Sequence, residues 1–123
     1  MPKRLWKSGV GAIILGRVFS LVDRKAAWAM GSTDQQRREV YYAGHVQGVG
    51  FRYTTHQIAK GFDVTGFVMN LPDGRVYLVV EAEPAEMSRF LSEIDHRLGE
   101  YIRDVKFAEL APTGEFNGFS IRH

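Results

Sequence analysis

Hydrophobic and polar positions follow two different rhythms along residues 37–123, and these rhythms predict an alternation of strands and helices. Residues 38–43 are rich in aromatic and β-branched side chains, which favour a first strand. Apolar residues then recur at helical spacing from Phe51 to Phe62, which predicts a helix. A second strand is expected over residues 64–70, where β-branched and aromatic residues return.

The second half of this region repeats the same order of elements. A Leu-Pro-Asp-Gly turn at residues 71–74 leads into a third strand over residues 75–82, whose alternate positions are apolar. Pro84 suits the first turn of a helix, and apolar residues recur at helical spacing after it. Alternation predicts a fourth strand over residues 102–110 and a short last strand over residues 116–121.

This order of elements, β-α-β-β-α-β with one further strand, is the split βαβ plan of the ferredoxin-like fold. We therefore predict an α+β sandwich with a mostly antiparallel sheet of four to five strands and two helices on one face. The plan serves many functions, RNA binding among them, so the fold alone does not decide what the protein does.

Residues 1–36 differ from the rest of the chain. They start with basic residues, continue into a short apolar run at residues 10–16, and then carry further charges. The run is short, and the segment as a whole is too short and too charged to span a bilayer, so we expect no transmembrane segment. Three interpretations stay open: a poorly ordered or dispensable extension, an amphipathic helix on a membrane or partner, and a targeting signal. We take the first as the prediction, with residues 37–123 as the folded domain.

Composition and charge narrow the classes of function. The 123 residues, 45% of them hydrophobic, suit one small domain, and the absence of cysteine excludes disulfides and thiolate chemistry. Residues 1–36 carry a net charge of +4 and residues 37–123 a net charge of −2, so the domain itself is slightly acidic. We therefore expect no nucleic-acid partner. The four histidines show no metal-ligand spacing, so we expect no metal site.

The main candidate for chemistry is the stretch Tyr41–Arg52, which leads from the end of the first strand through a loop with three glycines to the start of the first helix. Glycines let backbone N–H groups turn toward a ligand, and a helix N-terminus attracts anions. With the forked guanidinium of Arg52, the stretch suits an anion cradle for phosphate, although a plain strand–helix turn would also need glycine. No lysine follows Gly50 as a P-loop requires, and the third glycine of the dinucleotide motif is missing.

Three segments together resemble the acylphosphatase family. They are G-H-V-Q-G-V-G-F-R at residues 44–52, G-F-V-M-N-L-P-D-G-R-V at residues 66–76, and P-T-G-E-F-N-G-F-S-I at residues 112–121. The resemblance extends over residues 37–122. Alone, Arg52 would be a surface helix arginine and Asn70 a residue before a turn; the combination of motifs is what distinguishes them.

The resemblance implies a hydrolase of the carboxyl-phosphate bond of small acyl phosphates that needs no metal and no cofactor. It implies that Arg52 holds the phosphate and that Asn70 orients the attacking water. We expect a monomeric, cytoplasmic enzyme whose partner is a small-molecule acyl phosphate. The backbone N–H groups implied to share the phosphate with Arg52 belong to Val46, Gln47, Gly48, Val49, Gly50 and Phe51.

Two other functions remain as alternatives: a non-catalytic module that binds phosphoanions, and a single-strand RNA binder, against which the charge of the domain speaks. The sequence departs from the family pattern at Asp63, Phe67 and Met69, where the family often has glycine, tryptophan and a basic residue. Loss of a basic side chain beside Asn70 would weaken attraction for an anionic substrate. None of these departures changes Arg52 or Asn70 themselves.

Overall fold

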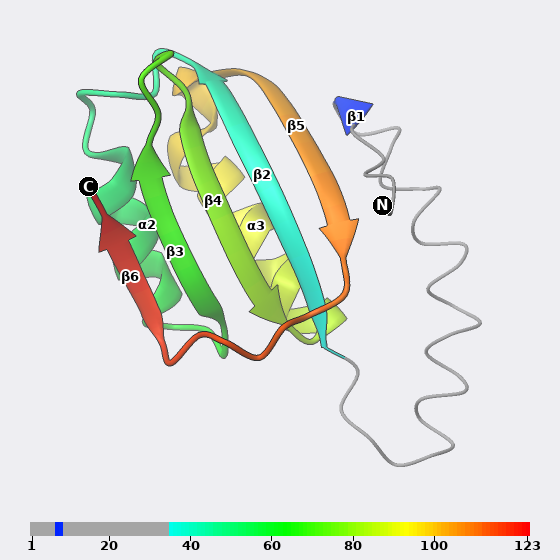
Figure 1. The fold of residues 1–123 in the computed structure, drawn as a ribbon. Coiled ribbons are helices and arrows are strands. Elements are labelled where there is room, and N and C mark those ends of the chain that lie inside the picture. Colours follow the sequence, from blue (N-terminus) through cyan, green and yellow to red (C-terminus); the bar gives the residue numbers. More distant parts are fainter. Residues whose placement is uncertain (1–6, 9–34) are drawn as a thin grey trace, which may run out of the picture.

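The computed structural model describes residues 7–8 and 35–123 of the chain. Their strands form one six-stranded sheet in the order β1-β5-β2-β4-β3-β6, and two helices lie against one face of it (Figure 1). The elements in chain order are β1 (Lys7–Ser8), β2 (Gln36–Gly44), α2 (Phe51–Ala59), β3 (Thr65–Asn70), β4 (Val76–Ala82), α3 (Pro84–Leu98), the short 3-10 helix η1 (Gly99–Tyr101), β5 (Ile102–Leu110) and β6 (Phe119–Arg122).

The pairing of the strands confirms the predicted ferredoxin-like fold. The central strand β2 pairs antiparallel with β4 on one side and with β5 on the other. Strand β3 pairs antiparallel with β4 and parallel with β6, which makes the sheet mostly antiparallel. The sequence did not predict β1, which pairs antiparallel with β5 and adds the sixth strand. The expectations for the remaining residues up to 34 lie outside the described residues.

Two predicted boundaries differ from the observed ones. Helix α2 ends at Ala59, because the next three residues form a tight turn in which the Gly61 N–H donates to the Ile58 carbonyl at 2.9 Å. The last strand begins at Phe119 and not at residue 116: Gly118, directly before it, has a φ of +119°, and Phe116 lies outside the strand with its ring 5.8 Å from that of Phe67. Phe62 was predicted to lie in the helix and Phe116 in the last strand. Both instead lie outside these elements and are partly buried.

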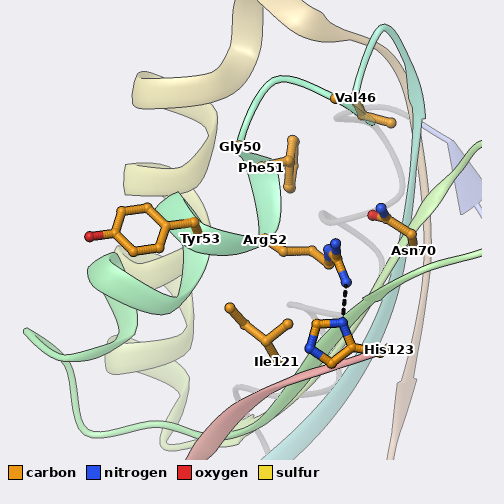
Figure 2. Close-up of a pocket in the computed structure, with 9 residues that line it drawn as sticks. Val46, Gly50, Phe51, Arg52, Tyr53, Asn70, Ile121 and His123 are labelled. Atoms are coloured by element: carbon orange, nitrogen blue, oxygen red, sulfur yellow. Dashed lines mark hydrogen bonds between the residues drawn. The ribbon is translucent and has the colours of Figure 1, made fainter.

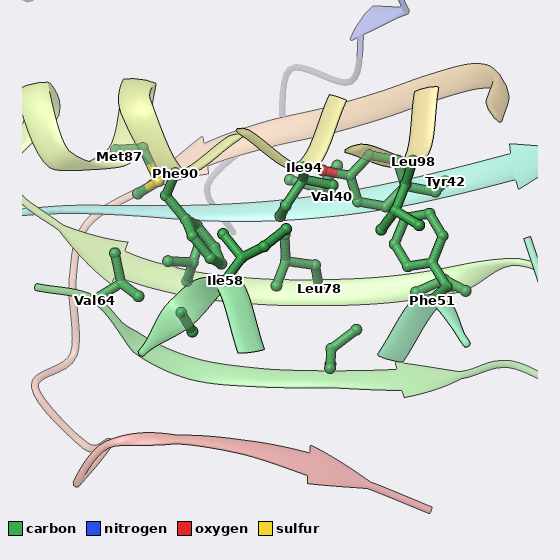
Figure 3. Packing of buried hydrophobic residues seen from close by; sticks show 14 of the residues in the cluster. Val40, Tyr42, Phe51, Ile58, Val64, Leu78, Met87, Phe90, Ile94 and Leu98 are labelled. Carbon is green, nitrogen blue, oxygen red and sulfur yellow. The ribbon is translucent and has the colours of Figure 1, made fainter. Parts of the chain in front are cut away.

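The hydrophobic core lies between the sheet and the two helices (Figure 3). Alternate residues of β4 face this core, which is why Val76, Leu78, Val80 and Ala82 are all fully buried. Each helix contributes the stripe of apolar side chains that its sequence spacing predicts. None of the described helices is long and apolar enough to cross a membrane. The stripes consist of Phe51, Thr55, Ile58 and Ala59 on α2, and of Met87, Phe90, Ile94 and Leu98 on α3.

A buried ion-pair cluster on the opposite face holds the connection between β5 and β6. Glu81 is only 3% exposed and accepts hydrogen bonds from the Arg37 guanidinium, from the backbone N–H groups of Thr113 and Gly114, and from the Thr113 hydroxyl. Burial alone would raise the pKa of Glu81, but these hydrogen bonds outweigh it and hold the pKa below its ordinary value. The cluster thereby ties the approach to β6 onto the end of β4.

Candidate active site

The glycine-containing loop between β2 and α2 has a backbone that other residues rarely adopt. Gly48 and Gly50 have φ angles of +83° and +78°, in the left-handed region that favours glycine. Gly50 is the N-cap of α2 and makes no side-chain capping bond, so the first N–H groups of the helix have no side-chain acceptor from the cap. The loop and helix end therefore present N–H donors and the positive end of the helix dipole at one place.

Two anchors hold this loop against the rest of the domain. The side chain of Val46 is 0% exposed and belongs to the hydrophobic core. The side-chain amide of Gln47 donates hydrogen bonds of 2.9 Å to the Leu71 carbonyl and 3.0 Å to the Arg75 carbonyl, at the turn between β3 and β4. The loop is consequently tied both to the core beneath it and to the strand that ends at Asn70.

Arg52 lies in the first turn of α2 and reaches toward the end of β6. Its Nη1 donates to the Arg122 carbonyl oxygen at 3.3 Å and contacts the His123 Nδ1 at 3.3 Å. These distances are at the long end of the hydrogen-bond range, so the contacts are weak. Both use one nitrogen of the guanidinium, and within the described residues the remaining N–H groups of the fork make no hydrogen bond.

Asn70 is the last residue of β3, and it shares a pocket with Arg52. Figure 2 shows the two side chains extending toward one another across this pocket, while Tyr53 points away from it. The pocket has a volume of about 230 Å³. It is lined by Val46, Gly48, Gly50, Phe51, Arg52, Tyr53, Asn70, Ile121 and His123.

Six of the eight predicted site residues line the pocket, and the remaining two, Gln47 and Val49, do not. Sequence reasoning missed three lining residues: Tyr53, which follows Arg52 on α2, and the two C-terminal residues Ile121 and His123. The parallel register of β6 beside β3 explains the place of the two C-terminal residues, because Met69 pairs with Arg122 and the next residues along are Asn70 and His123. By the alternation of a strand, Met69 lies on the sheet face opposite Asn70.

The charges around the pocket favour an anionic ligand. No aspartate or glutamate lines it, and Arg52 contributes a permanent positive charge. Among the described residues, no group of three His, Cys, Asp or Glu side chains is arranged to hold a metal ion. The arrangement suits a tetrahedral oxyanion that is held by the guanidinium and by the N–H groups of the loop.

Comparison with known proteins identifies the family of the chain. The sequence profile of the family described as Acylphosphatase matches residues 38–121. The chain is 48% identical over 56 residues to an acylphosphatase of Archaeoglobus fulgidus, a match that covers 46% of this chain and 63% of that protein. It is 40% identical over 89 residues to an acylphosphatase of Marinobacter nauticus, covering 71% of this chain and 96% of that protein.

A solved structure is similar over the same region. The crystal structure of acylphosphatase from Bacillus subtilis superimposes with a TM-score of 0.65 at 26% sequence identity, covering 72% of this chain and 99% of that one. The family profile spans well over half of the chain and includes the loop, Arg52 and Asn70. The chain therefore belongs to the acylphosphatase family of enzymes.

Proposed function

We propose that the chain hydrolyses the carboxyl-phosphate bond of small acyl phosphates and releases a carboxylate and inorganic phosphate. One observation carries the proposal: Arg52, the glycine loop and Asn70 line a single pocket. An anion held by the first two would therefore lie beside the third. Membership of the acylphosphatase family supports the same reaction.

The phosphate group of the substrate would bind between the Arg52 guanidinium and the N–H groups of residues 46–51. A guanidinium can donate two parallel hydrogen bonds to phosphate oxygens, and charge-assisted bonds of this kind are stronger than neutral ones. The 3.3 Å contacts of Arg52 with Arg122 and His123 are long and readily exchanged for phosphate oxygens. Donors that are already in place need little reorganisation as charge develops in the transition state.

Asn70 would orient the water that attacks phosphorus. The water oxygen forms a bond to phosphorus while the bond to the acyl oxygen breaks, and the electron pair of that bond leaves with the carboxylate. A carboxylate departs readily as an anion, so no general acid is required, in accord with a pocket that no aspartate or glutamate lines. An amide is no strong base, so the proton of the water passes to a phosphate oxygen.

The test is an assay of the purified full-length protein with acetyl phosphate or benzoyl phosphate, with EDTA present. We expect phosphate release well above the rate in buffer, and much slower release from phenyl phosphate, whose leaving group is poorer. Protein that is folded and binds phosphate by NMR but shows no turnover would instead be the non-catalytic phosphoanion-binding module. A monomeric state and a cytoplasmic location stay predictions from the sequence.

A further inference from the structure

Arg52 and His123 lie close enough for a hydrogen bond between the guanidinium Nη1 and the ring Nδ1. A guanidinium has N–H donors and no acceptor, so the His123 Nδ1 at 3.3 Å from Nη1 must be the acceptor. A ring nitrogen that accepts this hydrogen bond carries no proton, so a ring protonated on both nitrogens could not accept it. If the ring gained a second proton, the hydrogen bond would be lost and two cations would lie side by side.

Binding of a phosphate group reverses this preference. His123 lines the same pocket as Arg52, and Figure 2 shows its ring between the end of β6 and the guanidinium. A dianion held by Arg52 would take over the Nη1 donor and leave Nδ1 without its partner. The negative charge would then favour a charged imidazole, because an opposite charge within about 4–6 Å stabilises the ionised form of a side chain.

We propose that His123 takes up a proton as the phosphate group of the substrate enters the pocket, so that the ring changes from an acceptor for Arg52 into a second cation beside the phosphate. The inference rests on the proposed function, since it assigns the phosphate site to this pocket. It makes His123 a substrate-binding residue whose contribution depends on pH. Histidine suits this role because its charge changes between about pH 5 and pH 8.

The other charged and titratable groups near the ring leave this role to His123. On α2 the pocket is lined by Arg52 and by Tyr53, which is 63% exposed. On β6 the neighbouring Arg122 stacks its guanidinium over the Phe67 ring, 3.8 Å from the centroid.

Strand β3 contributes the neutral Asn70 to the pocket lining.

Two further histidines lie close to the site in the sequence and in the fold. His56 packs near Phe119, with 6.4 Å between ring centroids, and His45 is exposed at the start of the glycine loop. Neither of these lines the pocket, so both are suitable controls for a general effect of histidine charge.

The test uses sulfate as the probe, because sulfate remains a dianion while histidine titrates and therefore contributes no protonation of its own. Sulfate affinity of the full-length protein would be measured by NMR at about pH 5.5 and about pH 8, at constant ionic strength. We expect binding to be roughly tenfold tighter at the lower pH, the size of a one-unit coupling between the ring and the anion. His123→Gln should lose most of this dependence, and the matched variant His45→Gln should keep it.

A second variant separates charge from shape. His123→Lys places a permanent cation at the same position, so it should bind sulfate more tightly than the native protein at about pH 8 and show little change with pH. Equal pH dependence in the native protein and in His123→Gln would overturn the role of His123 while leaving the phosphate site intact. A native protein that binds no sulfate would overturn both this inference and the phosphate site, whereas sulfate binding without turnover would overturn only the proposed catalysis.

Discussion

The side-chain amide of Gln47 donates a 2.9 Å hydrogen bond to the carbonyl oxygen of Leu71, the residue that directly follows Asn70. A second bond of 3.0 Å from the same amide reaches the Arg75 carbonyl. One side chain thus connects the loop that would hold the phosphate to the strand end that would hold the water. We expect the relative position of the two halves of the site to depend in part on this bridge.

Substitution of Gln47 by Ala should therefore reduce activity, although Gln47 does not line the pocket. Loss of both bonds frees the loop from the turn after Asn70, so kcat/KM should fall by about tenfold and the free energy of unfolding by about 1–2 kcal/mol. Gln57→Ala, on the same side of the sheet but outside the pocket lining, is the control and should leave kcat/KM unchanged. Full activity of Gln47→Ala would show that the bridge has no role in positioning.

Arg52→Ala should act mainly on phosphate affinity. Removal of the fork deletes a charge-assisted contact to the phosphate, so we expect KM to rise and kcat/KM to fall by about a hundredfold or more. Arg52→Lys keeps the charge but loses the planar fork, and it should recover only a small part of the loss. Steady-state kinetics and phosphate titration by NMR measure both effects, and Arg89→Ala on the exposed side of α3 is the matched control.

Asn70→Ala should act mainly on turnover. Without the amide the water is no longer aimed at phosphorus, so kcat should fall by about a hundredfold, equivalent to about 3 kcal/mol, with little change in phosphate affinity. Asn117→Ala, in the exposed approach to β6, should behave as the native protein. If Asn70→Ala changed KM and left kcat alone, the residue would bind substrate and would not position water.

Gly50→Ala should destabilise the protein and distort the phosphate loop together. The residue has a φ of +78°, which costs an alanine about 1–2 kcal/mol, although no atom lies within 4 Å of the added Cβ. Gly61→Ala is a close control, because its φ is ordinary and its Cβ would make a normal 3.6 Å contact with the Ile58 carbonyl. Urea unfolding should show a loss in the first variant and no loss, or a small gain, in the second.

Glu81 should make stability depend on acidity. Hydrogen bonds from Thr113, Gly114 and Arg37 hold the pKa of Glu81 below its ordinary value in the folded protein, so the folded state binds fewer protons than the unfolded state. Its contribution to stability is therefore fully present above the ordinary pKa of a glutamate in the unfolded chain, and it is lost as the pH falls through the lower, folded pKa. Urea unfolding as a function of pH should show this loss, and Glu81→Gln should remove it while lowering stability at neutral pH by about 2–3 kcal/mol.

The sequence predicted the fold and singled out two side chains that line the pocket, Arg52 and Asn70, but it did not predict the whole lining. Helical spacing and strand alternation are local properties, so they located the elements, and the two long motifs singled out Arg52 and Asn70. Which strand lies beside β3 is decided by packing over long distances in the chain. His123 lies beside Asn70 because β6 runs parallel to β3 with Met69 opposite Arg122, a pairing that local sequence patterns do not predict.

Gln47 illustrates a different limit of the sequence. It was expected to contribute its backbone N–H to the phosphate, and that expectation stays a prediction. Its side chain reaches two carbonyls at the turn between β3 and β4, which are distant in sequence and meet it only in the folded domain. A hydrogen bond from a side chain to a backbone carbonyl cannot be predicted from residue types, because every residue has the same carbonyl acceptor.

The side chains of Val46 and Phe51 belong to two parts of the molecule at once. Both line the pocket, and both are members of the hydrophobic core, with exposures of 0% and 2%. The residues at the base of the pocket are therefore also core residues. This part of the pocket cannot unfold locally while the core remains packed. On heating, the loss of activity should coincide with global unfolding instead of preceding it.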